Sequence, residues 1–362
     1  MAISAADVKK LRDMTGAGMM DCKKALTETD GNFDEAVDFL KKKGLASAEK
    51  KAGRIAAEGI VSTVISDDSK SAVIIEVNSE TDFVAKNEKF QTYVAGLASQ
   101  ILKNDYADMA AFLADKSDID NAATVEEHHK SMIATIGENL TIRRFEKVTT
   151  DGAVVSYIHA GGKIGVIVDG TASDINDDVK EALKNIAMQI AAMNPQYVSR
   201  EDILPAELDH IREIITDSSL NDTATLPKPI LSDIFANVVD KFSAEDKAAY
   251  EENKNSKFLY NFLSEEAKAS LSERAMATKE AIKENKIFNG LLEGRVSKHL
   301  KEISLLDQPY VKAADGKQTV AAYLKTVAPD LKIAKFVRFE TGEGIEKKNE
   351  DFAAEVAKQM GQ

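Results

Sequence analysis

The sequence predicts an α+β protein: an N-terminal three-helix domain, a core of two subdomains in which helices pack on antiparallel sheets, a helical hairpin inserted in the second half, and a C-terminal helix. Three observations predict this fold class. Apolar residues recur at helical spacing through the first 43 residues. The order strand, turn, strand, helix occurs twice in the middle of the chain. Residues 205–292 are charged and carry helical apolar spacing.

The length and these changes in pattern set the domain boundaries that we expect. A chain of 362 residues can hold two or more domains and bury ample core. The pattern divides it into an N-terminal domain at 1–54, a first core subdomain at 55–149, a second core subdomain at 150–204 and 293–345, the helical hairpin at 205–292 and a C-terminal helical module at 346–362.

The composition excludes several classes of protein. Lys and Arg number 47 against 60 Asp and Glu, a net charge of -13, which argues against binding a nucleic-acid backbone. No apolar run reaches the roughly 18 residues of a membrane span, and the first residues lack the regions of a signal peptide, so we expect a soluble cytoplasmic protein. The single cysteine, Cys22, excludes an intramolecular disulfide and falls on the apolar face of a helix, as a core residue would.

The N-terminal residues show three short helical patterns, separated by 15–18 and 30–32. Their core leaves Met19 and Met20 without an obvious place inside, which suits a protein-docking surface, although one of them could equally close the small core. The basic run 41–44 should end this domain, and the further basic residues up to Arg54 should form a solvated linker rather than a nucleic-acid site.

Each half of the core has two strands, a turn and a helix. The predicted ranges are 59–65, 72–77 and 90–101 in the first half, and 154–158, 164–168 and 179–191 in the second. This repetition predicts two related subdomains, each with a helix laid on a small antiparallel sheet.

The later part of the chain is predicted to be mainly helical. The hairpin is interrupted by Pro227 and Pro229, and one of its faces should carry Ile230, Ile234, Val238 and Phe242. After the hairpin, 308–311 and 333–339 read as strands that return to the second subdomain. Residues 351–358 form a short amphipathic pattern, which would be marginal as a free helix and needs a partner surface.

One turn carries an unexpected residue. Thr81 to Val84 join the strand 72–77 to the helix that follows, with Thr81 or Asp82 as the N-cap and Asn87 and Glu88 in the first turns. Phe83 would then lie near the exposed start of this helix. One interpretation is a hydrophobic staple in which Phe83 packs on Asn87 or Phe90.

Motifs for catalysis or metal binding are weak. The segment HAGGKI at 159–164 lacks the Ser or Thr of a phosphate loop and leads into a strand. Asp118 and Asp120 lack the Gly and Glu of a calcium loop, and the adjacent His128 and His129 diverge on a helix. We therefore assign no catalytic residue, no metal and no cofactor.

Two segments closely resemble the signature segments of the bacterial elongation factor Ts family: TDFVAKNEKF at 81–90 and LRDMTGAGMMDCKKAL at 11–26. Further similar segments follow in one order along the chain, and the likeness is weak only at about 205–292. They are IGEN at 136–139, Arg143 with Arg144, YIH at 157–159, KIGV at 163–166, QPYV at 308–311 and FETGEGIE at 339–346.

The resemblance implies a guanine nucleotide exchange factor of elongation factor Tu that performs no covalent chemistry. It implies that the Asp82–Phe83 tip, with Thr81 and Val84, enters the partner's nucleotide-binding domain and dislocates the bound Mg²⁺. It implies that the N-terminal domain is built like a ubiquitin-associated domain, and that the hairpin replaces a shorter antiparallel coiled coil. The implied contact residues are Arg12, Met19, Met20, Lys23, Ile136, His159, Gly161, Gly162, Val311 and Phe352.

The sequence also allows other interpretations. His159 could be a turn residue with only local hydrogen bonds. A non-catalytic adaptor, with a ubiquitin-associated-like module and a helical hairpin, would bind partners without affecting a GTPase, and an enzyme is a more distant alternative. The insertion could also pair two copies into a homodimer, although its irregular apolar stripes give no register.

Overall fold

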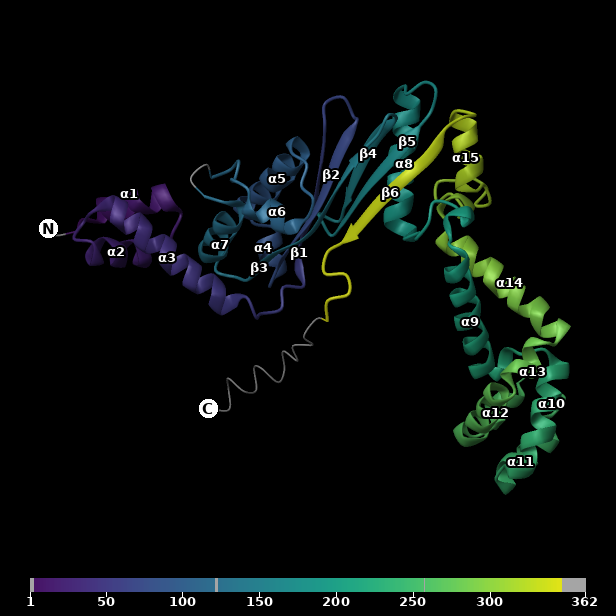
Figure 1. Cartoon of the computed structure of the whole chain (residues 1–362). Helices are drawn as coiled ribbons and strands as arrows, with labels where there is room; N and C mark the ends of the chain where they lie inside the picture. The colour runs from purple at the N-terminus through teal and green to yellow at the C-terminus, as the bar shows by residue number, and fades with distance from the viewer. Residues whose placement is uncertain (1–2, 121–122, 257, 347–362) are drawn as a thin grey trace. The chain divides into compact units, whose positions relative to one another are not determined.

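The computed structural model describes residues 3–120, 123–256 and 258–346. The described chain forms two compact units. One contains the residues up to Asn194 together with those from Ala321 onward, and the other contains Pro195–Val320 (Figure 1).

The first unit begins with the three predicted helices, α1 (Ala5–Thr15), α2 (Met19–Glu28) and α3 (Phe33–Lys51). Ser4 caps α1 in a capping box with Asp7, and the side chain of Asn32 accepts hydrogen bonds from the first backbone N–H groups of α3. The buried residues that the helices share are Val8, Leu11, Cys22, Ala25, Leu26 and Ala36.

The predicted end of this domain at residues 41–44 is wrong, because α3 continues without a break to Lys51. Gly44 and Ala48 are buried on one face of α3, one turn apart. A Cβ at Gly44 would lie 3.2 Å from the Cβ of Ala134 in α7 (Val125–Ile136), so the small residue permits close helix packing. Of the basic residues in the expected linker, Lys50 and Lys51 lie in the last turn of this helix, and Arg54 follows it.

The first sheet has the order β1 (Glu58–Ile65), β2 (Ser71–Ser79), β3 (Leu140–Thr149), with both pairs antiparallel. Between β2 and β3 the chain forms α4 (Asp82–Ala85), α5 (Glu88–Lys103), α6 (Met109–Ala114) and α7. The central strand β2 is buried on both faces. Its odd-numbered residues from Val73 to Val77 pack in the core that contains α5, and Ala72 and Ile74 face a second cluster shared with the other sheet.

The second sheet repeats this topology, which confirms the predicted repetition. Its order is β4 (Ala153–His159), β5 (Ile164–Thr171), β6 (Lys332–Glu340), again antiparallel. Helix α8 (Asp177–Met193) follows the second strand, as α5 does, and packs on β4 and β5. The chain then leaves this sheet, and α15 (Val320–Val327) precedes its return in β6.

The predicted strand at 308–311 is wrong. The short 3-10 helix η5 (Leu305–Asp307) precedes it, and the segment forms an isolated antiparallel bridge between Pro309 and Thr319 in place of a strand. Proline has no N–H to donate to a sheet ladder, which disfavours a regular strand at this place. The other returning strand, predicted at 333–339, is confirmed as β6.

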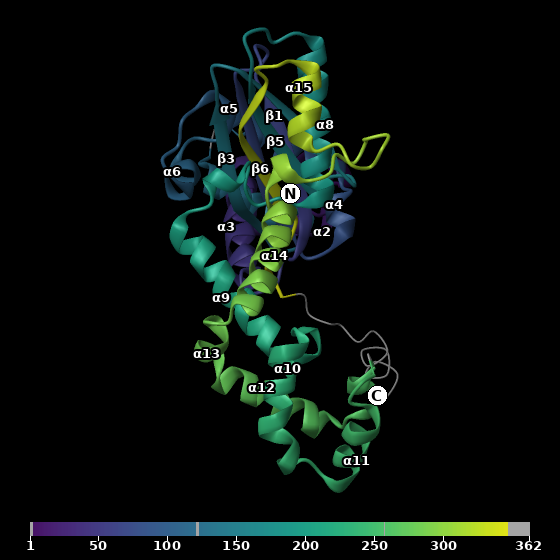
Figure 2. The same cartoon turned by 90° about the vertical axis from the view of Figure 1, so that its right-hand side faces the viewer.

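The second unit is helical and has a hydrophobic core of its own. Its two long arms are α9 (Pro205–Asn221) and α14 (Lys286–Ile303), which lie side by side in Figures 1 and 2. The apolar face predicted for the hairpin falls in the helices between these arms, and a hairpin alone does not describe them because they are several short segments. The helices between the arms are α10 (Lys228–Val238), α11 (Ala244–Asn253), α12 (Glu265–Ala277) and α13 (Lys279–Lys283), with short 3-10 turns η2 (Thr223–Thr225), η3 (Val239–Lys241) and η4 (Leu259–Phe262). A further 3-10 turn, η1 (Arg200–Asp202), precedes α9.

The apolar face predicted for this region is confirmed, because Ile230, Ile234, Val238 and Phe242 are all buried in the core of the second unit. The C-terminal helix predicted at 351–358, with Phe352, lies outside the described residues. Within the described chain, no helix is long and apolar enough to cross a membrane.

Candidate functional site

The turn after β2 is a structure of its own. The four-residue helix α4 holds Asp82 and Phe83, and α5 begins only after Asn87, whose side chain accepts hydrogen bonds from the N–H groups of Lys89 and Phe90. The predicted N-cap at Thr81 or Asp82 is therefore wrong for the long helix. We call residues Thr81–Val84 the tip.

Phe83 is exposed at the tip. Its side chain is 77% accessible to solvent, while Val84 beside it is buried in the core under the first sheet. The interpretation as a hydrophobic staple, with Phe83 packed on Asn87 or Phe90, is therefore wrong, and Phe90 is wholly buried by itself. The contact recorded for the Phe83 ring is with the ammonium group of Lys86, 5.9 Å from the ring centroid. Val84 thus anchors a turn that presents Phe83 outward.

The carboxylate of Glu138, in the loop after α7, holds the first residue of the tip. Glu138 accepts two hydrogen bonds from Thr81, one from the backbone N–H at 2.9 Å and one from the hydroxyl at 2.7 Å. In the reverse direction, Glu80 accepts a hydrogen bond from the N–H of Asn139. These crossed bonds fasten the start of the tip to the loop that follows α7. Ile136, the last residue of α7, packs against the same core cluster as Val84.

Asp82 carries the negative charge of the tip. The Nζ of Lys86 donates a hydrogen bond of 2.8 Å to its carboxylate, and this bond holds the pKa of Asp82 below its usual range. The positive charge of Lys163, in the loop between β4 and β5, acts in the same direction. Asp82 is therefore ionised at neutral pH.

The loop between β4 and β5 is fastened at one end and exposed at the other. The carbonyl oxygen of Gly162 accepts hydrogen bonds from the N–H of Val61 at 2.7 Å and from the hydroxyl of Thr341 at 3.1 Å. His159 and Gly161 stay exposed, and the side chain of His159 contacts the hydroxyl of Tyr157 at 2.9 Å. The local hydrogen bond expected for His159 is thus present, beside an exposed ring edge.

The N-terminal domain presents an apolar surface around one turn. Met19 and Met20 are exposed at the start of α2, so neither closes the small core, and Arg12 and Lys23 are exposed on the adjoining helices. Met14 is exposed at the end of α1, next to the same turn, and sequence reasoning missed it. Met14 does not continue the buried stripe of Val8 and Leu11 in α1, and this position was the signal in the sequence that it is exposed. Cys22 is buried, and burial raises the pKa of its thiol.

Val311 lies in the second unit and is about half exposed. Glu138 belongs to the similar segment at 136–139, but the sequence predicts no role for it. Gly137 ends α7 in the left-handed conformation, and the position of Glu138 directly after this cap was the signal in the sequence that its side chain leaves the helix.

The described residues contain no group of three or more His, Cys, Asp or Glu side chains that could hold a metal ion. His128 and His129 have separate partners. His128 bonds to Ser117, while His129 is buried between the hydroxyl of Tyr93 and the carbonyl oxygen of Leu140. Burial lowers the pKa of His129 to about 4, so its ring is neutral at physiological pH.

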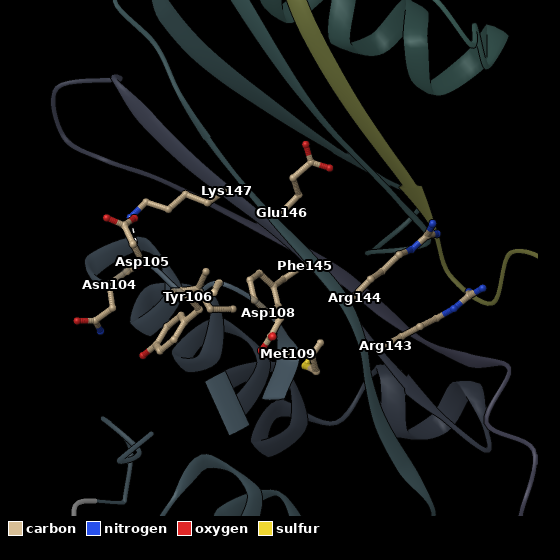
Figure 3. Close-up of a pocket in the computed structure, with 12 residues that line it drawn as sticks. Asn104, Asp105, Tyr106, Asp108, Met109, Arg143, Arg144, Phe145, Glu146 and Lys147 are labelled. Carbon is tan, nitrogen blue, oxygen red and sulfur yellow. Dashed lines mark hydrogen bonds and ion pairs between the residues drawn. The ribbon is translucent and has the colours of Figure 1, made fainter. Parts of the chain in front are cut away.

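A cavity of about 470 Å³ lies beside β3 (Figure 3). Its cationic side chains already have partners: Arg143 and Arg144 pair with Glu76, and Lys147 pairs with Asp105. The cavity therefore offers no unpaired cation among its described lining residues, and we assign it no ligand.

Comparison with known proteins gives a consistent result. The sequence model of a family described as Elongation factor TS matches residues 80–343. The chain is 42% identical over 360 residues to Elongation factor Ts of Clostridioides difficile (strain 630), and 41% identical over 363 residues to that of Clostridium novyi (strain NT). Each match covers 99% of both chains, and so does one of 39% identity with the protein of Halothermothrix orenii. The matches run through 205–292, so these relatives share the insertion.

Proposed function

Because the chain belongs to the elongation factor Ts family, whose role is to bind elongation factor Tu and promote GDP release, we propose that its tip performs this work. In this proposal Thr81–Val84 enter the nucleotide-binding domain of elongation factor Tu, and Asp82 and Phe83 displace the bound Mg²⁺ and its surroundings. The protein acts by binding alone, without covalent chemistry or a cofactor of its own.

The observation that carries the proposal is the exposure of Phe83 on a turn that is fastened at both ends. Glu138 holds Thr81, and Val84 is buried in the core. An aromatic ring held in water can gain about 1.5–3 kcal/mol when a partner covers it. Because the turn is already ordered, little of that gain is lost to ordering the tip on binding.

The chemistry of a GDP site explains why a small displacement is sufficient. Mg²⁺ requires nearly ideal octahedral coordination and keeps several water ligands while it bridges the phosphates. The ionised carboxylate of Asp82 can compete for those waters or for their backbone partners. GDP loses affinity when the metal is displaced, and by reciprocity GDP weakens the hold of this protein on its partner.

The tip cannot supply all of the energy. A thousandfold faster release requires about 4 kcal/mol of interaction that favours the nucleotide-free state, more than the burial of one Phe provides. We propose that the other contact residues contribute the rest. They are Arg12, Met19, Met20 and Lys23 of the N-terminal domain, Ile136, the loop residues His159, Gly161 and Gly162, Val311 of the second unit, and Phe352 of the C-terminal module.

As a translation factor the protein would work in the cytoplasm, with elongation factor Tu as its direct partner and without direct contact to nucleic acid. We propose the same domain boundaries as the sequence predicts: 1–54, 55–149, 150–204 with 293–345, 205–292 and 346–362. Pairing of two copies through the insertion is a further proposal, which the oligomeric state in solution would test.

The test is stopped-flow release of a fluorescent GDP analogue from elongation factor Tu at several Mg²⁺ concentrations. We expect strong acceleration that shrinks as Mg²⁺ rises, and a loss of about tenfold or more in Phe83→Ala, with an unchanged melting temperature. Phe258→Ala is the matched control, because Phe258 is also exposed, at 67%, but lies in the second unit. Binding without acceleration would instead support a non-catalytic adaptor.

A further inference from the structure

Asn139 is a buried amide between the tip and the end of the N-terminal domain. It lies in the loop between α7 and β3, directly after Glu138, and is only 4% exposed. Its Nδ2 group donates a hydrogen bond of 2.8 Å to the carbonyl oxygen of Arg54. A buried amide needs such a partner, because leaving it without one costs free energy. Asn139 thus ties its loop to a residue that lies 85 positions away in the chain.

Arg54 lies where the chain passes from the N-terminal domain to the core. Helix α3 ends at Lys51, and β1 begins at Glu58. The N–H of Arg54 donates to the carbonyl oxygen of Lys51 at 2.8 Å, and its own carbonyl oxygen accepts the bond from Asn139. The exit of α3 is therefore bonded on one side to the helix and on the other side to the core.

Glu80 closes these contacts into a ring. Its carboxylate accepts the backbone N–H of Asn139, and Nη1 of Arg54 lies 3.4 Å from one of its oxygens. The ion pair alone is weak, because the side chain of Arg54 is 55% exposed. Glu80 directly precedes Thr81, the first residue of the tip. The exit of α3, the end of β2 and the loop after α7 thus meet at the base of the tip.

Two neighbouring residues of one loop therefore hold two different structures. Glu138 holds Thr81 with its carboxylate, and Asn139 holds Arg54 with its side-chain amide. Replacing the side chain of Asn139 removes the bond to Arg54, but it leaves the bonds of Glu138 and the backbone bond to Glu80 in place. An effect on the N-terminal domain can therefore be separated from an effect on the tip.

We propose that Asn139 is a positioning residue for nucleotide exchange: it fixes the exit of α3 against the base of the tip, so that the surface with Met19 and Met20 meets elongation factor Tu at a fixed position relative to Phe83. The inference rests on the proposed function, because it assumes that both surfaces contact the GTPase. Since Asn139 is buried, it acts through Arg54 and α3 and not by contact with the partner.

The test is a double-mutant cycle in the full-length protein, read by the concentration that gives half-maximal GDP release. One change is Asn139→Ala, and the other combines Met19→Ser with Met20→Ser. Asn139→Ala should raise this concentration about fivefold, the effect of one neutral hydrogen bond, and the methionine variant should raise it about tenfold. Because Asn139 acts through the methionine surface, the combined variant should stay within about twofold of the methionine variant. Independent effects would instead multiply to about fiftyfold, which overturns the inference.

Amide hydrogen exchange gives an independent readout. In Asn139→Ala the N–H of Arg54 should exchange faster, whereas that of Thr81 should keep its wild-type rate because Glu138 still holds it. A Thr81 amide that also becomes faster would mean that Asn139 supports the tip, against the inference. So would an unchanged half-saturating concentration despite a faster Arg54 amide.

The matched control is Asn237→Ala in α10. Asn237 Nδ2 also donates to a backbone carbonyl, that of Asp233 at 2.7 Å, but it is exposed and lies in the second unit, so GDP release should not change. If Asn139→Ala does not fold, Arg54→Gly replaces it in the same cycle, because it removes the pair with Glu80 and frees the backbone that Asn139 holds. A wild-type protein that fails to accelerate release refutes the proposed function instead.

Discussion

Replacing Glu138 by glutamine should loosen the tip without removing any group that touches the partner. The carboxylate of Glu138 accepts both the N–H and the hydroxyl of Thr81. A glutamine of the same size keeps one acceptor oxygen, while its NH₂ group faces the second donor. One charge-assisted hydrogen bond is lost at a partly buried site, which corresponds to about 1.5 kcal/mol or roughly a tenfold effect.

The expected result of Glu138→Gln is a release rate about tenfold lower at saturating concentration, with a smaller change in the concentration needed for half-saturation. Stopped-flow measurements at two Mg²⁺ concentrations would give both quantities. Amide hydrogen exchange at Thr81 should become faster in parallel. The matched control is Glu126→Gln, which removes an exposed pair with Lys130 on the same helix α7.

One result would refute this reasoning. If the Thr81 amide exchanges faster in Glu138→Gln while GDP release keeps its wild-type rate, the tip does not need to be held rigid. A variant that loses its rate together with its cooperative melting would instead mean that Glu138 supports the fold, and Phe83→Ala would then be the cleaner probe.

The remaining predictions concern stability and affinity. Burial lowers the pKa of His129 from 6.5 to about 4, so the unfolded state binds a proton at a higher pH than the folded state does. The free energy of unfolding should therefore fall by about 3 kcal/mol as the pH falls from 6.5 to 4. His129→Gln should remove this pH dependence, as measured by chemical denaturation at several pH values. Gly342→Ala should cost about 3 kcal/mol or more by melting, whereas Gly344→Ala, at nearly the same φ but in open space, should cost about 1 kcal/mol. Met20→Ser should raise the half-saturating concentration about threefold or more with an unchanged maximal rate, and Met193→Ser on α8 should leave both constant.

Local sequence patterns predicted the regular elements well. Strand β2 and helix α5 followed from apolar residues at the spacing of each element, and the repetition of this order gave the topology of both sheets. The end of α3 was mispredicted because the basic run 41–44 and Gly44 were read as a break. The small residues Gly44 and Ala48 in fact mark a face that packs closely on α7, a partner that lies far away in the sequence.

The site was predicted less completely, and for a physical reason. The spacing around Phe83 suits a buried staple and an exposed tip equally well, and the position of the helix cap at Asn87 decides between them. The roles of Glu138 and Asn139 depend on residues 57 and 85 positions away along the chain, so no local pattern contains them. Inside the insertion the sequence predicted the apolar face of α10 but not the number of helices, because the core there is made of many short segments.

The uninterrupted course of α3 has a consequence for how the two proposed contact surfaces act together. If a disordered segment joined them, the exposed surface with Met19 and Met20 and the tip would bind as two separate ligands. Each would then lose its own translational and rotational entropy, and the second contact would be favoured only by its effective concentration. A helix that continues from the N-terminal domain onto α7, whose following loop holds Thr81, makes them one preorganised ligand. Most of the translational and rotational entropy is then lost only once, on the first contact. The binding free energy of the second contact is therefore available to distort the nucleotide site.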